Sequence, residues 1–158
     1  MADDEMVTKV QPEALRKPGY CMIQGNPCKI SEIVHIPKAT ANGNKRVRLV
    51  GNHVFSGKKY EDTLNCTAGF HGIDVPVTHK SWYSLLDVDT GSGFLSLMMD
   101  SGDTKEDASL GRAEDGEAFD DVGQEIVRRF QADEALKVAV LSIMGKDLVV
   151  EVSKDTDI

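Results

Sequence analysis

Residues 119–130 have the sequence FDDVGQEIVRRF, and their apolar side chains repeat with a helical period. These side chains fall three, seven, eight and eleven positions after the first phenylalanine, which places them on one face of an α-helix of about three turns. Asp120 and Asp121 come at the start and Arg128 and Arg129 near the end, the charge order that a helix dipole favours. The stretch therefore predicts one amphipathic helix.

Five strand-like segments surround this helix. Three precede it and two follow it, at residues 82–88, 94–99, 104–110, 137–143 and 147–152. The last two alternate in polarity around Gly145 and Lys146, which predicts a terminal hairpin. Three strands, a helix and two strands within about 75 residues is the element order of a five-stranded OB-fold barrel.

The chain before residue 78 has short strand-like runs and no long helical pattern. Residues 20–24 and 28–34 are apolar-rich and are divided by a Gly-Asn-Pro turn signal, which predicts a hairpin. Residues 36–44 are polar and rich in turn-forming residues, and they lie between two strand-like runs. We therefore expect an exposed hairpin loop at this position.

Residues 45–50 alternate in polarity. Val47 and Leu49 fall on one face and Arg46 and Arg48 on the other, and this period of two predicts a half-buried strand with a cationic outer face. Long cationic side chains beside an exposed loop can contact phosphate groups. The alternative interpretation is a solvated charged edge that discourages aggregation.

Charge is distributed unequally along the 158 residues. The net charge of −8 alone would argue against a nucleic-acid partner, but residues 1–77 have 10 basic and 8 acidic side chains, and residues 78–158 have 8 and 18. Residues 14–77 alone have 9 basic and 4 acidic side chains. Such asymmetry indicates a polyanionic partner for the first part and a different role for the second.

Composition indicates a folded protein, with 41% hydrophobic and 28% charged residues. Residues 1–14 have little periodicity, so we expect a flexible tail there. No apolar run approaches the roughly 20 residues of a membrane helix, and the amino terminus lacks signal-peptide features, so we expect a cytoplasmic protein without a membrane partner. The odd number and irregular spacing of Cys21, Cys28 and Cys66 predict reduced, mostly buried thiols.

The sequence predicts neither a catalytic residue nor a metal site. The four histidines are scattered, with no pair at metal-ligand spacing. Asp87, Asp89 and Gly91 resemble only the beginning of a calcium loop, because its closing glutamate is absent. The acidic cluster at 114–121 is best explained as a solvated loop and helix start, since paired catalytic carboxylates need an enclosing cleft. We therefore do not expect an enzyme.

A more specific signal comes from a set of residues whose order matches that of a known family. The chain resembles eukaryotic translation initiation factor 5A, the relative of bacterial elongation factor P that carries the modified lysine hypusine. The matching residues are Leu15, Arg16, Lys17, Gly19, Gly25, Pro27, Cys28, Lys29, Phe55, Gly57, Lys58, Lys59, Glu61, Asp62, Val75, Pro76, Leu86, Asp87, Gly93, Phe94, Leu95, Ser96, Leu97, Gly102, Asp103, Thr104, Lys105, Glu106, Asp107, Ser142, Met144 and Gly145.

This resemblance implies a mostly β protein with an SH3-like barrel at 15–77 and a five-stranded OB-fold with one helix at 78–158. It also implies a translation elongation factor that binds the ribosome between the peptidyl and exit tRNA sites. Such factors direct the hypusine hairpin towards the acceptor end of the peptidyl tRNA, promote peptide-bond formation at stalling sequences such as polyproline, and assist termination. The factor orients the tRNA while the ribosome performs the chemistry.

The chain departs from the family at the tip of this hairpin. Family members have Lys, Thr, Gly, Lys, His, Gly there, with the second lysine modified, whereas residues 37–45 are PKATANGNK. Counting from Lys29 places the modified position at Thr40, and counting from Phe55 places it at Ala41, because this loop is one residue longer. Lys38 is the nearest lysine and the candidate for hypusine derived from spermidine, with deoxyhypusine synthase as a further partner. Modification of another lysine and an unmodified tip both stay open.

The resemblance and the charge pattern together define a set of expected RNA contacts. The implied partners are the ribosome, its rRNA and the peptidyl tRNA, with no cofactor beyond the covalent hypusine. An alternative is an unmodified paralogue that acts as an RNA-binding or scaffolding module, and the sequence leaves open whether a homodimer forms. The expected contact residues are Lys38, Ala39, Thr40, Ala41, Asn42, Gly43, Lys45, Arg46, Arg48, Lys58 and Lys59.

Overall fold

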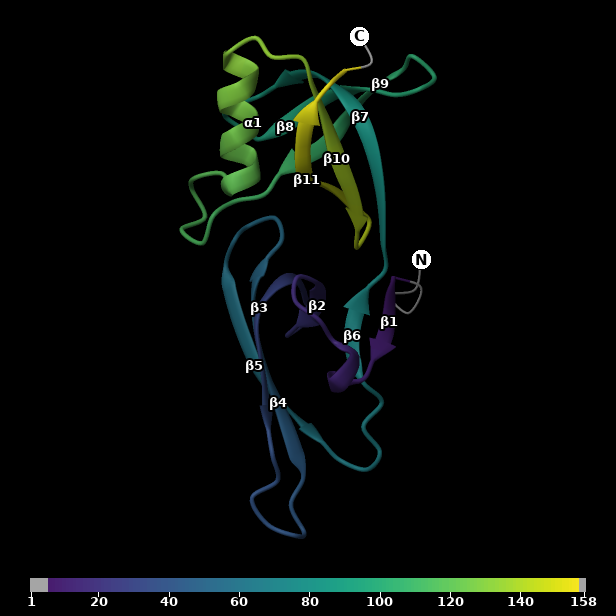
Figure 1. Cartoon of the computed structure of the whole chain (residues 1–158), viewed down its shortest axis with the longest axis vertical. Helices are drawn as coiled ribbons and strands as arrows, with labels where there is room; N and C mark the ends of the chain where they lie inside the picture. Colours follow the sequence, from purple (N-terminus) through teal and green to yellow (C-terminus); the bar gives the residue numbers. More distant parts are fainter. Residues whose placement is uncertain (1–5, 157–158) are drawn as a thin grey trace. The chain divides into compact units, whose positions relative to one another are not determined.

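The computed structural model describes residues 6–156, which are mostly strands with one α-helix (Figure 1). The chain divides into two compact units. The first unit ends at Val77 and the second begins at Thr78, except that Phe55–Gly57 groups with the second. The change of unit after Val77 coincides with the change in charge balance. The mostly β class predicted from the sequence is confirmed.

The second unit is a closed barrel of five strands. They are β7 (Thr78–Val88), β8 (Phe94–Met98), β9 (Thr104–Leu110), β10 (Leu136–Ile143) and β11 (Lys146–Lys154). Their order around the barrel is β7, β8, β9, β11, β10, and β10 closes the barrel against β7. Only the β9–β11 pair is parallel among these neighbours. This is the five-stranded OB-fold that the element order predicted.

The helix α1 (Asp121–Gln131) forms over the predicted amphipathic stretch, beginning two residues after Phe119 and ending one residue after Phe130, and it packs against the barrel (Figure 1). The Asp120 side chain caps it by accepting a 2.8 Å hydrogen bond from the Gly123 N–H. Ile126 is fully buried in the barrel core, together with Leu97 and Val138. The sequence predicted this helix because its apolar face, its cap and its terminal charges are all local features.

The first unit contains a four-stranded antiparallel sheet and a separate two-stranded ribbon. The sheet follows chain order and consists of β2 (Tyr20–Ile23), β3 (Asn26–Ile36), β4 (Lys45–His53) and β5 (Lys59–Cys66). The ribbon pairs β1 (Val7–Val10) with β6 (Ile73–Pro76). Cys21, Val47 and Ile73 are buried in the core that the strands enclose.

The predicted flexible tail at 1–14 is wrong for its second part. Residues 7–10 form β1, and residues 12–14 form a short 3-10 helix. Lys9 forms an ion pair with Asp74 of β6 at 2.5 Å. A strand of four residues has too little periodicity to be recognised, and β1 is stabilised by a partner that is distant in the chain. Residues 1–5 lie outside the described residues.

No helix between residues 6 and 156 is long and apolar enough to span a membrane. The three cysteines are free thiols, and Cys21 and Cys28, which face each other across β2 and β3, are fully buried. Burial raises the pKa of Cys21 to about 12 and that of Cys28 to about 11.

Candidate nucleic-acid interface

The expected hairpin loop connects β3 and β4 at residues 37–44, as the sequence predicted. The two strands pair up to the loop, with Ile36 opposite Arg46, and they hold it at one end of the sheet (Figure 1). Within the loop, the Gly43 N–H donates a 3.0 Å hydrogen bond to the Thr40 carbonyl. This bond makes a tight turn that includes Thr40 and Ala41, the two positions expected from the sequence for the modified residue.

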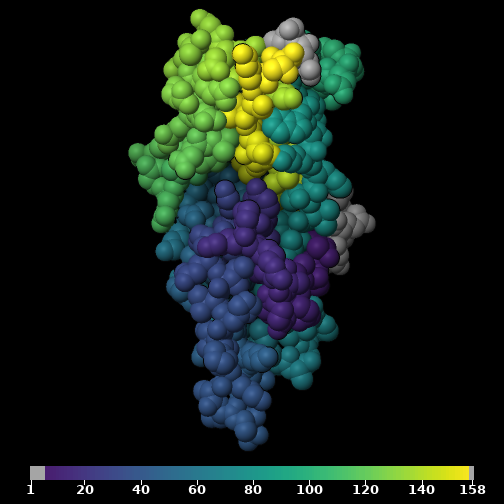
Figure 2. Space-filling model, in the orientation of Figure 1, coloured from purple at the N-terminus to yellow at the C-terminus, as the bar shows by residue number. Residues whose placement is uncertain are grey.

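The loop side chains project into solvent (Figure 2). Residues 37–42 and 44 are exposed and Gly43 is half-buried. Lys38 lies two residues before the turn, on the β3 side, and within residues 6–156 it forms neither a hydrogen bond nor an ion pair that would restrain it. Lys45, also exposed, is the first residue of β4. The tip itself is therefore neutral, and one lysine flanks it on each side.

The predicted alternation along β4 is confirmed. Val47 and Leu49 are buried, and the arginines lie on the opposite face. However, Arg48 is already paired, with its Nη2 2.7 Å from Glu61 Oε2 and its Nη1 3.8 Å from Glu32 Oε2. A phosphate would have to compete with these carboxylates for Arg48. Arg46 and Lys45 form no ion pair within the described residues, so they are better placed to bind phosphate.

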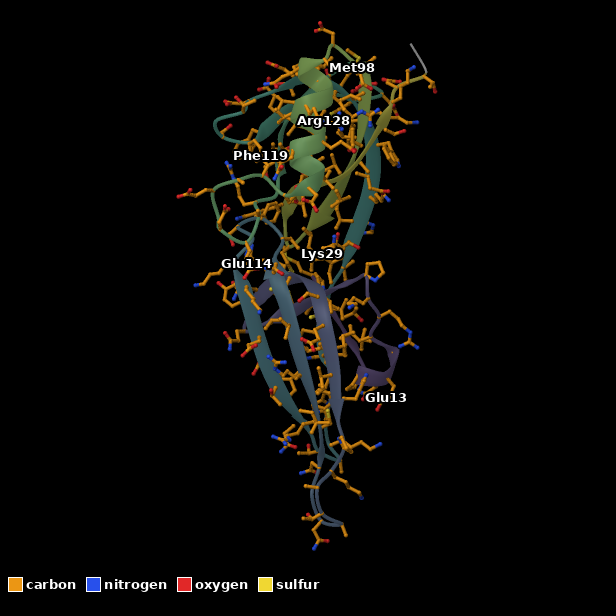
Figure 3. The ribbon with its side chains drawn as sticks, turned by 60° about the vertical axis from the view of Figure 1, so that its left-hand side comes forward. Glu13, Lys29, Met98, Glu114, Phe119 and Arg128 are labelled. Atoms are coloured by element: carbon orange, nitrogen blue, oxygen red, sulfur yellow. The ribbon has the colours of Figure 1, made fainter. Side chains whose placement is uncertain are left out.

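Lys58 and Lys59 do not join the loop cluster. They lie at the other end of β4, separated from the loop by a strand that spans roughly 25 Å. Lys59 is opposite Asn52, and Lys29 is opposite the same asparagine from the other side. Figure 3 labels Lys29 at this end of the sheet, remote from the loop. Lys29 and Lys59 thus form a second cationic row, which the sequence did not reveal because it depends on strand pairing.

A cavity of about 510 Å³ lies at the root of the loop, within the first unit. Three segments that are far apart in the chain line it, namely residues 11–13, both strand ends at the loop, and residues 66–70. The Cys66 pKa is raised, first by burial and then by the Glu13 carboxylate, while Lys45 acts to lower it. Glu13, labelled in Figure 3, and Lys45 therefore both act electrostatically on this cavity. We refer to it as the loop-root cavity.

The described residues contain no group of three or more His, Cys, Asp or Glu side chains placed to hold a metal ion. The arrangement instead offers exposed cations, a neutral loop tip and an apolar hollow. Such a surface can bind a polyanion and position it.

Two family models match the chain. A model of the translation initiation factor 5A-like amino-terminal domain matches residues 7–68. A model described as eukaryotic elongation factor 5A hypusine, DNA-binding OB fold, matches residues 77–153. Together they cover both units.

Individual relatives extend the match over most of the chain. Eukaryotic translation initiation factor 5A of Spodoptera exigua is 37% identical over 147 residues, covering 93% of this chain and 84% of the relative. Eukaryotic translation initiation factor 5A-1 of Saccharomyces cerevisiae is 38% identical over 141 residues, covering 89% and 82%.

Solved structures of 5A-family proteins are also similar to this chain over most of its length. A translation initiation factor 5A family protein from Naegleria fowleri matches 94% of this chain and 99% of its own, with a TM-score of 0.67 and 28% identity. The 5A factor of Methanococcus jannaschii has a TM-score of 0.64 over 93% of this chain and 95% of its own. At 19% identity, the latter supports the fold alone.

Proposed function

This chain belongs to the eukaryotic translation initiation factor 5A family of translation factors, and from that premise we propose that it binds the ribosome beside the peptidyl tRNA. There it promotes peptide-bond formation at stalling sequences and assists termination. The observation that carries the proposal is the exposed loop at 37–44 with two cations at its root, Lys45 and Arg46, which form no ion pair within residues 6–156. In this role the cations bind RNA phosphate, and the loop orients the acceptor end of the tRNA.

A reconstituted translation assay with a polyproline template tests this function. The wild-type factor should increase the rate of full-length synthesis, and the double substitution Lys45→Glu, Arg46→Glu should abolish the increase. The double substitution Lys58→Glu, Lys59→Glu makes the same charge change at the remote end of the sheet, and its effect measures how much these two expected contacts contribute relative to Lys45 and Arg46. Absence of any stimulation by the factor purified from its native source would contradict the proposal.

Lys38 is the proposed site of hypusine, formed from spermidine through deoxyhypusine synthase. Its exposure and its lack of restraining contacts among the described residues support access by a modifying enzyme. Intact-mass measurement of the native protein, followed by fragmentation of the loop peptide, should locate the added mass on Lys38. An unmodified mass would rule hypusine out.

An unmodified RNA-binding or scaffolding paralogue is the second candidate function. It is favoured by the threonine and alanine that occupy the two alternative family positions, Thr40 and Ala41. The substitution Lys38→Arg separates the candidates, because it keeps the positive charge and removes the amine that is modified. Stimulation lost in Lys38→Arg indicates hypusine. Stimulation or RNA binding that persists in this variant, with the usual steep decrease at high salt, indicates the unmodified module.

A further inference from the structure

The loop-root cavity has the composition of a small-ligand site. Its volume of about 510 Å³ is within the range of roughly 300–1,000 Å³ that such sites occupy. Apolar groups of Ile36, Pro37 and Phe70 line it, and the cations of Lys45 and Arg46 lie on the same lining. A hollow with apolar walls and cationic groups suits a ligand that has a flat apolar part joined to an anion.

The charged groups narrow the choice of ligand. Lys45 and Arg46 form no ion pair within residues 6–156, while Glu13, His35 and both cations are exposed at the cavity. An acidic peptide carries several carboxylates, and Glu13 would repel those that do not reach Lys45 or Arg46. A nucleotide avoids this conflict, because its base edge carries N–H donors for a carboxylate and its phosphate provides the anion.

We infer that the loop-root cavity accepts a single unpaired nucleotide of an RNA chain, with the base against Ile36, Pro37 and Phe70 and its phosphate on Lys45 and Arg46. This inference rests on the proposed RNA-binding function and adds a defined subsite to it. A paired base cannot enter, because its edge and both faces are already occupied in the duplex. The first unit should therefore prefer single-stranded RNA to blunt duplex RNA.

Cys66 provides a native reporter for occupancy of this cavity. It lines the hollow and is half-buried, whereas Cys21 and Cys28 are fully buried with strongly raised pKa values. At about pH 9, where more thiolate is available, an alkylating reagent should therefore react first with Cys66. The rate of this reaction can be followed by mass spectrometry on the full chain without any substitution.

The first test compares protection of Cys66 by two RNAs. A single-stranded oligoribonucleotide of about 12 nucleotides, present at about ten times its Kd, should slow the alkylation of Cys66 about tenfold. A blunt duplex with a similar number of phosphates, at the same multiple of its own Kd, should leave the rate unchanged. Equal protection by both RNAs, or protection by neither although both bind, would overturn the inference.

A second test fills the cavity and keeps its charges. Ala68→Trp introduces a large side chain at an exposed position of the lining and should weaken single-stranded binding about tenfold, the loss expected for one stacked base. Its affinity for blunt duplex should stay unchanged. The control Ala118→Trp places the same side chain at an exposed position of the second unit. Thr67→Trp, also on the lining, replaces Ala68→Trp if that variant fails to fold.

These outcomes separate the subsite from the function on which it rests. Single-stranded RNA that binds wild-type and Ala68→Trp protein equally well would remove the subsite and leave RNA binding intact. Absence of any RNA binding by the wild-type protein would contradict the RNA-binding function itself, and the subsite with it.

Discussion

Each unit of the chain contains a long β-hairpin, and the two hairpins end differently. The β10–β11 hairpin closes through Met144 and Gly145, which have φ angles of 48° and 78°, as in a type I′ turn. The β3–β4 hairpin closes through the eight positions 37–44, and its strands are paired up to Ile36 and Arg46. The short turn belongs to a closed barrel, whereas the side chains of the long loop are mostly exposed to solvent.

The comparison shows how one kind of element serves two purposes. In the β10–β11 hairpin, six of the eight β10 residues are buried, and Leu148 and Val149 of β11 are buried opposite Leu141 and Val140, so packing constrains most positions of β10. In the β3–β4 hairpin, burial ends at Val47, and the residues beyond it are exposed or half-buried. Stability should therefore depend strongly on the first hairpin end and weakly on the second, and matched substitutions can measure the difference.

The largest contrast is expected for the isoleucines that precede the two connections. Ile143 is fully buried, so Ile143→Ala should lower the free energy of unfolding by about 2–5 kcal/mol. Ile36 is half-buried, and Ile36→Ala should lower it by about 1 kcal/mol or less. Urea denaturation measures both, with Trp82 fluorescence for the second unit and circular dichroism for the first. Equal losses would show that the loop end is as tightly packed as the barrel.

A second contrast concerns ion pairs. The Lys105 amine is 2.8 Å from Asp107 and 2.9 Å from Asp147, and the Lys105 and Asp147 side chains are only 17% and 22% exposed. Lys105→Met should therefore cost about 1–3 kcal/mol by leaving a partly buried carboxylate unpaired. Arg48→Met, at the more exposed Glu61 pair, should cost about 1 kcal/mol or less. Urea denaturation measures the free energy of unfolding of both variants. A larger loss of stability for Arg48→Met than for Lys105→Met would contradict this prediction.

The Lys105 pairing also predicts a pH dependence. Hydrogen bonding from Lys105 lowers the Asp107 pKa. A carboxyl whose pKa is lowered by folding stabilises the fold above its unfolded pKa of about 4, and this contribution is lost as the pH falls through the folded value. Wild-type protein should therefore lose more stability than Lys105→Met between pH 5 and more acid conditions, of about pH 2–3. Parallel pH profiles of the two proteins would disprove the coupling.

Glycine substitutions in the two connections should differ less. Gly145 has a φ of 78°, and Gly145→Ala should cost about 1–2 kcal/mol because a side chain disfavours this conformation. Gly43 has no such φ, and an added Cβ would lie 3.1 Å from the Thr40 Oγ1, which can rotate away. Gly43→Ala should change stability by about 0.5 kcal/mol or less. Thermal unfolding measures the stability of both variants. A similar loss of stability in both would mean that the Gly43–Thr40 turn tolerates a side chain as poorly as the barrel turn does.

The smallest effect is expected for loop length. Deleting Ala41 gives the loop the length that the family resemblance implies, and the free energy of loop closure changes by only a few tenths of a kcal/mol. The thermal unfolding temperature should therefore be nearly unchanged. Any translation activity that depends on Lys38 should change, because the deletion shifts the loop tip by one residue relative to β4. A large loss of stability would show that this tip packs against another part of the protein.

Several features could be predicted because neighbours in the chain decide them. The helix at 121–131, the loop at 37–44 and the outward direction of Arg46 and Arg48 each follow from local periodicity or turn chemistry. Strand β1 was missed because its hydrogen-bond partners lie in β6, distant in sequence. Glu61 also lies on a different strand from Arg48. The sequence therefore predicted that the Arg48 side chain points outward, but it did not predict the ion pair with Glu61.

The sequence by itself determined the alternating strands, the single amphipathic helix, the unequal charge of the two parts and the absence of a lysine at the tip. These properties depend on residue type and on spacing along a few turns or strands. Tertiary structure alone decided that Arg48 is paired while Lys45 and Arg46 form no ion pair among the described residues. It also decided that Lys29 aligns with Lys59, and that residues 11–13 and 66–70 enclose a hollow with the loop root. Charge pairing and concavity arise only where distant segments meet, and strand register sets which side chains face each other.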